Sequence, residues 1–112
     1  MQVQARLRHY RMAPRKVRLV TDMIKGMDVE RAINTLQVTG KKCAPILRKL
    51  VESAVANADQ RGDMDIDSLY ISRAFVDEGP TMRRFQPRAM GRATRINKRS
   101  SHVTVILDDE RY

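Results

Sequence analysis

Residues 79–99 read GPTMRRFQPRAMGRATRINKR, and this stretch connects two runs that have the composition of β-strands. It contains seven Arg and Lys residues and no acid. The connection between two hairpin strands usually has two to five residues. A connection over residues 79–99 is therefore predicted to be functional, disordered, or a continuation of the hairpin as an extended ribbon.

The runs on either side of this stretch predict two antiparallel strands. Residues 66–78 are rich in β-branched and aromatic side chains, and Val103, Val105 and Leu107 alternate with other residues. A third strand is predicted at 2–8, where small and aliphatic residues alternate with Gln and Arg. The polar and basic side of this strand is expected to face outward.

Three helices are predicted between the first strand and the second. Pro14 suits the first turn of a helix that ends at Gly26. Asp28 is expected to N-cap a second helix that stops at Gly40. A third helix is expected from about residue 41 to residue 60, with Pro45 near its start and a break at residues 61–63.

This order of elements predicts an α+β fold, with three helices packed on a small three-stranded antiparallel sheet and a long extended β-hairpin. The length of 112 residues fits a single domain over 1–112, from which residues 79–100 protrude as a basic hairpin. An isolated ribbon of this kind has no core and its like charges repel one another. A partner must therefore supply both order and countercharge.

The positive charge of the chain lies in two segments. The net charge is +9 overall, +6 over residues 1–26 and +7 over residues 79–99. Residues 27–78 and 100–112 each have a net charge of −2. An asymmetry of this kind predicts that one face of the protein meets a polyanion.

Arginine predominates in residues 79–99, and its guanidinium group suits bidentate contacts to phosphate. Structured RNA is the partner that fits best; duplex DNA, and a disordered basic loop that binds any polyanion, remain alternatives. The N-terminal cations are predicted to form a second RNA contact rather than a merely solvated face. These residues are Arg6, Arg8, Arg11, Arg15, Lys16 and Arg18.

Other patterns do not predict an enzyme, a metal site or a cofactor. Cys43 is the single cysteine, which excludes an internal disulfide and favours a reducing compartment. His9 and His102 have no ligand at metal-binding spacing, and Asp63, Asp65 and Asp67 resemble a calcium loop without its glycine and its glutamate. The sequence Gly40-Lys41-Lys42 lacks the remaining residues of a phosphate-binding loop.

Two long segments resemble the family of bacterial-type large-subunit ribosomal protein twenty-two. They are ARLRHYRMAPRKVRLVTDMIKG (5–26) and VDEGPTMRRFQPRAMGRATRINKRSSHVTV (76–105), and the resemblance covers essentially the whole chain. It implies a structural constituent of the large ribosomal subunit that binds rRNA, helps to assemble the subunit, and lies near the polypeptide exit. The hairpin is then expected to line the exit tunnel.

The resemblance also assigns roles within the hairpin. Met82, Arg83 and Arg84 are expected near the tunnel constriction, and residues 88–92 at the tip. Arg95, Lys98 and Arg99 are expected to bind rRNA on the returning arm. The predicted hairpin contacts to RNA are Arg83, Arg84, Arg88, Arg92, Arg95, Lys98 and Arg99, and the predicted tunnel-lining residues are Met82, Arg83, Arg84, Arg88, Ala89, Met90, Gly91 and Arg92.

The expected partners are large-subunit rRNA, neighbouring ribosomal proteins and the nascent polypeptide, with no membrane and no homo-oligomer. The N-terminus lacks the apolar core of a signal peptide, and no long apolar run is present, so a soluble cytoplasmic protein in the ribosome is predicted. A nucleoid-type DNA-binding regulator, suggested by the pI of 10.4, is the alternative.

Overall fold

The computed structural model describes residues 2–80, 82–87 and 93–109, with the strands at 82–87 and 93–98 described by their backbone. The chain measures 63 × 26 × 22 Å along its principal axes. In chain order the elements are β1 (Gln2–Tyr10), α1 (Pro14–Ile24), α2 (Val29–Val38), α3 (Ala44–Arg61), the 3-10 helix η1 (Ile66–Ser68), β2 (Tyr70–Glu78), β3 (Met82–Pro87), β4 (Ala93–Lys98) and β5 (Ser101–Asp108).

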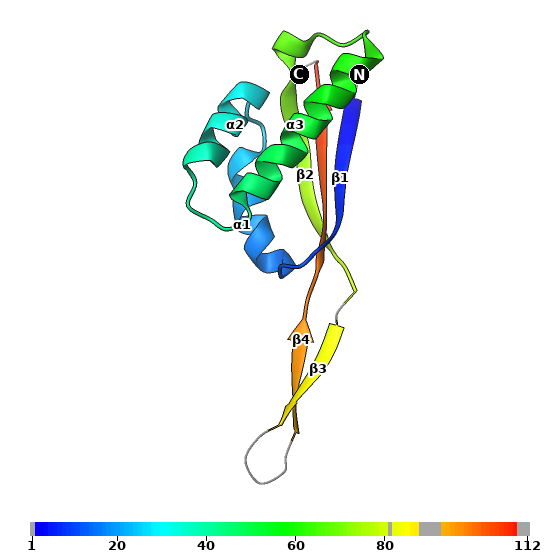
Figure 1. Ribbon diagram of the computed structural model, residues 1–112. Coiled ribbons are helices and arrows are strands. Elements are labelled where there is room, and N and C mark those ends of the chain that lie inside the picture. Colours follow the sequence, from blue (N-terminus) through cyan, green and yellow to red (C-terminus); the bar gives the residue numbers. More distant parts are fainter. Residues whose placement is uncertain (1, 81, 88–92, 110–112) are drawn as a thin grey trace.

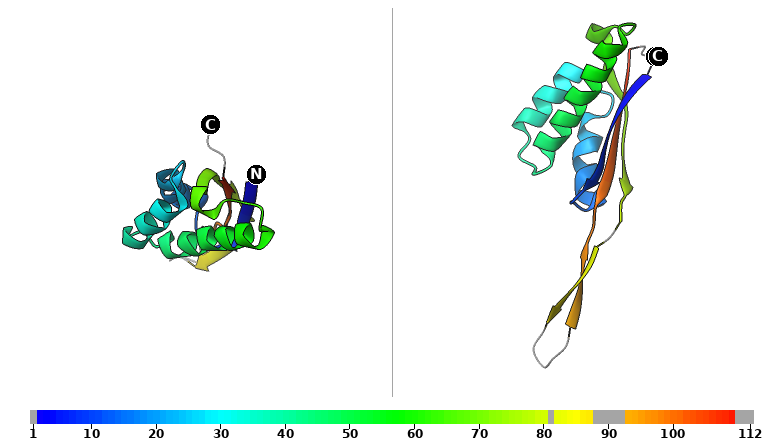
Figure 2. Two further views of the ribbon diagram at one scale, coloured as in Figure 1. Left: turned by 90° about the horizontal axis from the view of Figure 1, so that it is seen from above. Right: turned by 45° about the vertical axis from the view of Figure 1, so that its right-hand side comes forward.

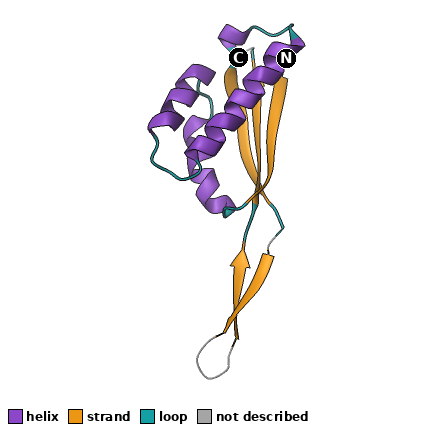
Figure 3. Ribbon diagram, viewed as in Figure 1, coloured by secondary structure: helices purple, strands orange, loops and turns teal. Residues whose placement is uncertain are grey.

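The central sheet has three antiparallel strands in the order β1-β5-β2. The right-hand view of Figure 2 shows the three helices as a layer on one side of this sheet, and Figure 3 shows the same separation of helices from strands. The predicted α+β fold, with three helices on a three-stranded antiparallel sheet, is confirmed. The predicted pairing of the second and last strands of this sheet is also confirmed, with Val76 opposite Val103.

An aliphatic core lies between the helices and the sheet. The helical spacing in α1 buries Val17, Val20 and Ile24 completely, and the alternation in β5 does the same for Val103 and Val105. The chain has no Trp, so branched aliphatic side chains fill this interior. This core fixes the orientation of β1 and α1, the two elements that contain all of the predicted N-terminal cations except Arg11.

Side chains from the helices cover both edges of the sheet. On β1, the carbonyl of Gln4 accepts a hydrogen bond of 3.2 Å from the amide of Asn57, and the carbonyl of Gln2 accepts one of 2.8 Å from Arg61. On β2, the carbonyl of Val76 accepts a hydrogen bond of 2.8 Å from Arg18. Such bonds occupy the unpaired backbone groups of edge strands, which otherwise invite pairing with other chains.

Two helix ends differ from the prediction. α3 begins at Ala44 rather than near residue 41, because Pro45 has no N–H and is tolerated only in the first turn of a helix. α2 begins after Asp28 as expected, but the Asp28 side chain makes no capping hydrogen bond. Instead, the N–H of Val29 donates to the carbonyl of Leu69 at 3.2 Å, so that a neighbouring segment satisfies the start of the helix.

The strand predicted over residues 66–78 begins only at Tyr70. Its first residues form η1, because the carboxylate of Asp65 accepts hydrogen bonds from the N–H of Asp67 at 3.2 Å and the hydroxyl of Ser68 at 2.7 Å. An Asp that bonds to the backbone two residues later favours a turn over a strand. The predicted interpretation of this acidic run as a turn rather than a calcium loop is consistent with these bonds.

Candidate nucleic-acid interface

The basic residues of β1 lie on the face of the sheet that the helices leave open. Ala5 is 6% exposed and faces the core, whereas Arg6 and Arg8 on the opposite side are exposed. Alternation along a strand sends successive side chains to opposite faces, as the sequence predicted. The open face therefore has a row of cations along β1.

Arg73 of β2 adds a cation to this open face that the sequence analysis missed. Thr104 in the central strand is paired with Arg6 on one side and with Phe75 on the other. The guanidinium of Arg73 lies 6.0 Å from the centre of the Phe75 ring, which is 36% exposed. A partly exposed ring beside cations is a surface on which bases can stack. Alternation along residues 70–78 places Arg73 and Phe75 on the same face of the strand. The sequence does not show that this is the face that the helices leave open.

The end of β1 brings the N-terminal cations to the point where the hairpin leaves the sheet. Tyr10 at the end of β1 and Glu78 at the end of β2 both pair with Ser101, the first residue of β5. The hydroxyl of Ser101 donates to the carbonyl of Met12, which fixes the turn that contains Arg11. Exposed Arg11 therefore lies at the root of the hairpin.

The first turn of α1 lies at the same end of the molecule. In Figure 1, α1 starts beside the ends of β2 and β5 that lead to β3 and β4. Arg15 and Lys16 are exposed there, and this turn contains no acidic residue. Cations oppose the positive end of a helix macrodipole, so Arg15 and Lys16 do not stabilise the start of α1. Arg18 is also exposed, but it donates one hydrogen bond to β2 as described above.

The segments that lead from the central sheet to β3 and β4 contact each other. The N–H of Gly79 donates to the carbonyl of Ser100 at 3.0 Å, and the hydroxyl of Ser100 donates to the carbonyl of Pro80 at 2.7 Å. A Cβ atom on Gly79 would lie 2.5 Å from the Ser100 hydroxyl oxygen and 3.2 Å from Cε1 of His102. The two segments therefore approach so closely at Gly79 that a larger residue would displace the Ser100 and His102 side chains.

His9 and His102 meet at this root, which the sequence analysis did not foresee. The N–H of His9 donates to Nδ1 of His102 at 3.1 Å, and the two rings meet edge to face with their centres 4.8 Å apart. His9 has a φ of 60° and lies in an irregularity between Leu7 and Tyr10. This contact follows from the pairing of β1 with β5. The composition of the strands does not reveal which strands pair with each other.

The predicted hairpin residues divide between the described strands and the connection between them. β3 and β4 form an antiparallel pair in which Met82 is opposite Lys98 and Arg84 is opposite Ile96. Arg83 belongs to β3, Arg95 to β4, and the exposed Arg99 follows β4. The predicted tip residues Arg88, Ala89, Met90, Gly91 and Arg92 lie outside the described residues.

Two basic segments that are far apart in the sequence thus meet at one end of the helix-covered sheet. Arg11, Arg15 and Lys16 come from the N-terminal segment, and Arg99 comes from the hairpin. The opposite end of the sheet, where Tyr70 pairs with Asp108, lies beside η1, which contains Asp67 and follows Asp63 and Asp65. A field with this polarity orients a polyanion toward the hairpin end.

A comparison with known protein families identifies the family of this chain. Residues 5–108, which include both basic segments, match the family described as ribosomal protein L22p/L17e. The chain belongs to the ribosomal protein L22p/L17e family. As a member of this family it is a structural constituent of the large ribosomal subunit, a ribonucleoprotein that acts in translation. The resemblance stated from the sequence is confirmed at the level of this family.

The single cysteine of the chain, Cys43, lies in the core. Cys43 is 2% exposed, and burial raises the pKa of its thiol, which does not favour a reactive thiolate. Within residues 2–80, 82–87 and 93–109, no three His, Cys, Asp or Glu side chains gather as metal ligands do. The helices of the same ranges are also too short or too polar to cross a bilayer.

Proposed function

We propose that this member of the L22p/L17e family binds large-subunit rRNA through two surfaces that meet at the root of the hairpin. One surface consists of the N-terminal cations on β1, in the following turn and on α1. The other consists of the basic residues of the hairpin itself. The observation that supports this proposal most strongly is the convergence of Arg11, Arg15 and Arg99 at the end of the sheet from which the hairpin extends.

The two surfaces suit a role in subunit assembly. Phosphate contacts made by separate segments of one rigid domain can hold two stretches of RNA in a fixed relative position. The hydrogen bonds between Gly79, Pro80 and Ser100 couple the hairpin to the sheet, so that the two surfaces act together. In this proposal the domain lies on the outside of the subunit near the polypeptide exit, in contact with neighbouring ribosomal proteins, in a cytoplasmic ribosome.

The hairpin is proposed to reach into the subunit and line the exit tunnel, where it meets the nascent polypeptide. Met82, Arg83 and Arg84 would lie near the constriction, and residues 88–92 would form the tip. Arg95, Lys98 and Arg99 would bind rRNA along the returning arm. Family membership and the acid-free sequence of residues 79–99 support this part of the proposal.

The salt dependence of binding to an rRNA fragment tests the hairpin surface. Replacement of Arg83, Arg84, Arg88 and Arg92 by Gln removes four cations from the hairpin. The log–log slope of affinity against salt should then flatten by about 0.7–0.9 for each phosphate that the protein no longer neutralises. An unchanged slope contradicts an RNA-binding role for these residues.

The N-terminal surface is tested separately with a charge-matched control. Replacing Arg11, Arg15 and Lys16 by Gln should flatten the slope by roughly 2–3 if each cation neutralises one phosphate. The control replaces Lys25, Arg31 and Arg61, which are also exposed and lie toward the opposite end of the sheet, where Gly26 bonds to Ile71 and Arg61 bonds to Gln2. This control should leave the slope nearly unchanged. Equal effects of the two triple variants would mean that net charge alone governs binding.

Sedimentation of a native lysate distinguishes the proposal from DNA binding. The protein should co-migrate with large ribosomal subunits through a wash at moderate salt. A pool that is bound to DNA and free of ribosomes would contradict the proposal.

A further inference from the structure

The end of the molecule opposite the hairpin differs in charge from the rest of this basic protein. Asp63, Asp65 and Asp67 precede β2 at this end, Asp108 ends β5 and Asp109 follows it, while the nearby Arg61 pairs with Asp63 at 3.5 Å. The N–H of Asp65, just before η1, donates to the carboxylate of Asp109 at 3.3 Å, so the acidic turn and the end of β5 lie together. Acidic side chains repel RNA phosphates, which favours a partner of another chemical class at this end.

A hollow of about 440 Å³ lies at this end, between α2, α3 and η1. Five aliphatic side chains line it. Val29, Ile33 and Val55 are partly buried against the core, Leu69 is 2% exposed, and Ile66 is 38% exposed. An apolar floor of this kind gains free energy when an aliphatic side chain of a partner displaces water from it.

The remaining lining of the hollow is acidic or neutral. It consists of Asp28, Glu30, Glu52 and Asp67, all exposed, together with Asn34, and none of the residues that line the hollow is basic. Glu52 has Arg48 near it, but 3.9 Å separates the Arg48 Nε from the carboxylate oxygen, and the Arg48 and Glu52 side chains are 34% and 50% exposed, so the ion pair is loose and partly exposed. Such a pair contributes little free energy, so Glu52 can exchange it for a contact to a partner.

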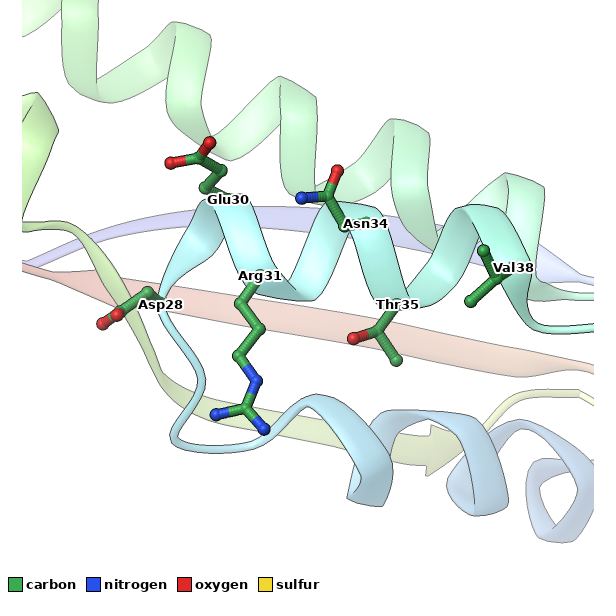
Figure 4. A pocket seen from close by; sticks show the side chains of 6 residues that line it. All are labelled: Asp28, Glu30, Arg31, Asn34, Thr35 and Val38. Atoms are coloured by element: carbon green, nitrogen blue, oxygen red, sulfur yellow. The ribbon is translucent and has the colours of Figure 1, made fainter.

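The orientation of the α2 side chains keeps this region acidic. Figure 4 shows a second hollow along the same helix, of about 510 Å³, that shares Asp28, Glu30 and Asn34 with the first. In this view Glu30 and Asn34 lie on the side of α2 nearer α3, whereas Arg31 points toward α1. The basic side chain of α2 therefore does not neutralise the hollow between α2 and α3.

We propose that the hollow between α2, α3 and η1 docks a segment of another protein that is rich in Lys or Arg and contains an aliphatic side chain. The aliphatic side chain would enter between Ile33, Val55 and Leu69, and flanking cations would meet Glu30, Glu52 and Asp67. This inference goes beyond the proposed function, because it gives a protein partner to the end that the proposed RNA contacts leave free.

Fluorescence anisotropy with a labelled peptide of alternating Lys and Leu tests the proposal on the full chain. The net charge of the protein repels such a peptide in general, so saturable binding requires a local acidic site. A peptide of alternating Lys and Ser has the same charge without the aliphatic groups and should bind at least several-fold more weakly. Equal binding of the two peptides would overturn the role of the apolar floor.

Charge reversal locates the site. Glu30→Lys and Glu52→Lys should each weaken binding of the Lys-Leu peptide about fivefold or more, since each replaces an attraction by a repulsion. The control is Asp22→Lys, because Asp22 is an exposed helical acid paired with Lys25 at 3.0 Å, outside the hollow. The control should change the affinity by less than about twofold.

Three outcomes would overturn the proposal. They are equal effects of Glu52→Lys and Asp22→Lys, no saturable binding of the peptide, and self-association of the protein through this hollow in the absence of peptide. Glu30→Gln and Glu52→Gln change the surface less than the Lys substitutions do, and they should weaken binding of the Lys-Leu peptide in the same rank order. Weaker binding by the Gln variants would exclude misfolding of the Lys variants as the cause. Binding to the rRNA fragment should stay unchanged in all of these variants, so failure of this inference is distinguishable from failure of the proposed function.

Discussion

Replacing Gly79 by Ala should loosen the connection between the hairpin and the sheet. The added Cβ would lie 2.5 Å from the Ser100 hydroxyl oxygen and 3.2–3.3 Å from two atoms of the His102 ring. The Ser100 side chain must then turn away and break its 2.7 Å hydrogen bond to the carbonyl of Pro80. Breaking this bond costs about 0.5–1.5 kcal/mol, and displacement of the His102 ring raises the expected total to about 1–2 kcal/mol.

A double-mutant cycle measured by urea unfolding checks this reasoning. Ser100→Ala alone should cost about 1 kcal/mol, because it also removes the hydrogen bond to Pro80. In the Gly79→Ala background it should cost almost nothing, which gives a coupling of about 1 kcal/mol. Gly40→Ala is the control, since a Cβ at position 40 meets no atom within 4 Å. Additive single effects, or equal free energies of unfolding for Gly79→Ala and Gly40→Ala, would refute the steric argument.

Further predictions concern the core, the thiol and one edge of the sheet. Leu47→Ala should lower the free energy of unfolding by about 2–5 kcal/mol, because Leu47 is completely buried; a decrease below about 1 kcal/mol in urea would contradict this packing. The raised pKa of Cys43 keeps its thiolate population at pH 8 below that of a free cysteine. A thiol reagent should therefore label Cys43 slowly until urea unfolds the chain. Fast labelling of the folded protein would contradict the burial of Cys43. Arg18→Met should cost about 1 kcal/mol because it removes the hydrogen bond to Val76, whereas Arg15→Met should change the free energy of unfolding by less than about 0.5 kcal/mol.

Periodicity in the sequence predicts most of the fold because the core here is built from regular alternation. The spacing of Val17, Val20 and Ile24 identifies the buried side of α1, and the alternation in 2–8 identifies the open side of β1. Periodicity does not reveal competing local bonds. The hydrogen bond from Asp67 to Asp65 converts the start of a predicted strand into η1, and the bond from Val29 to Leu69 replaces the expected capping bond of Asp28.

The candidate site is predicted from the sequence as residue types and segments, but not as an arrangement. Charge counting identifies both basic segments, because excess cations without acids are visible in any linear sequence. Their meeting depends on the pairing of Tyr10 and Glu78 with Ser101, which is a long-range property of the sheet. The same pairing brings His9 to His102, and it explains why the two histidines looked unrelated in the sequence.

A structure of the large ribosomal subunit that contains this chain is the most direct test of whether the hairpin end of the domain is the rRNA-binding end. We predict that the guanidinium groups of Arg11 and Arg15 lie within about 3 Å of phosphate oxygens, the usual hydrogen-bond distance. The acidic end around η1 should face away from RNA. A subunit in which Arg11 and Arg15 face solvent while η1 lies against RNA would contradict the account.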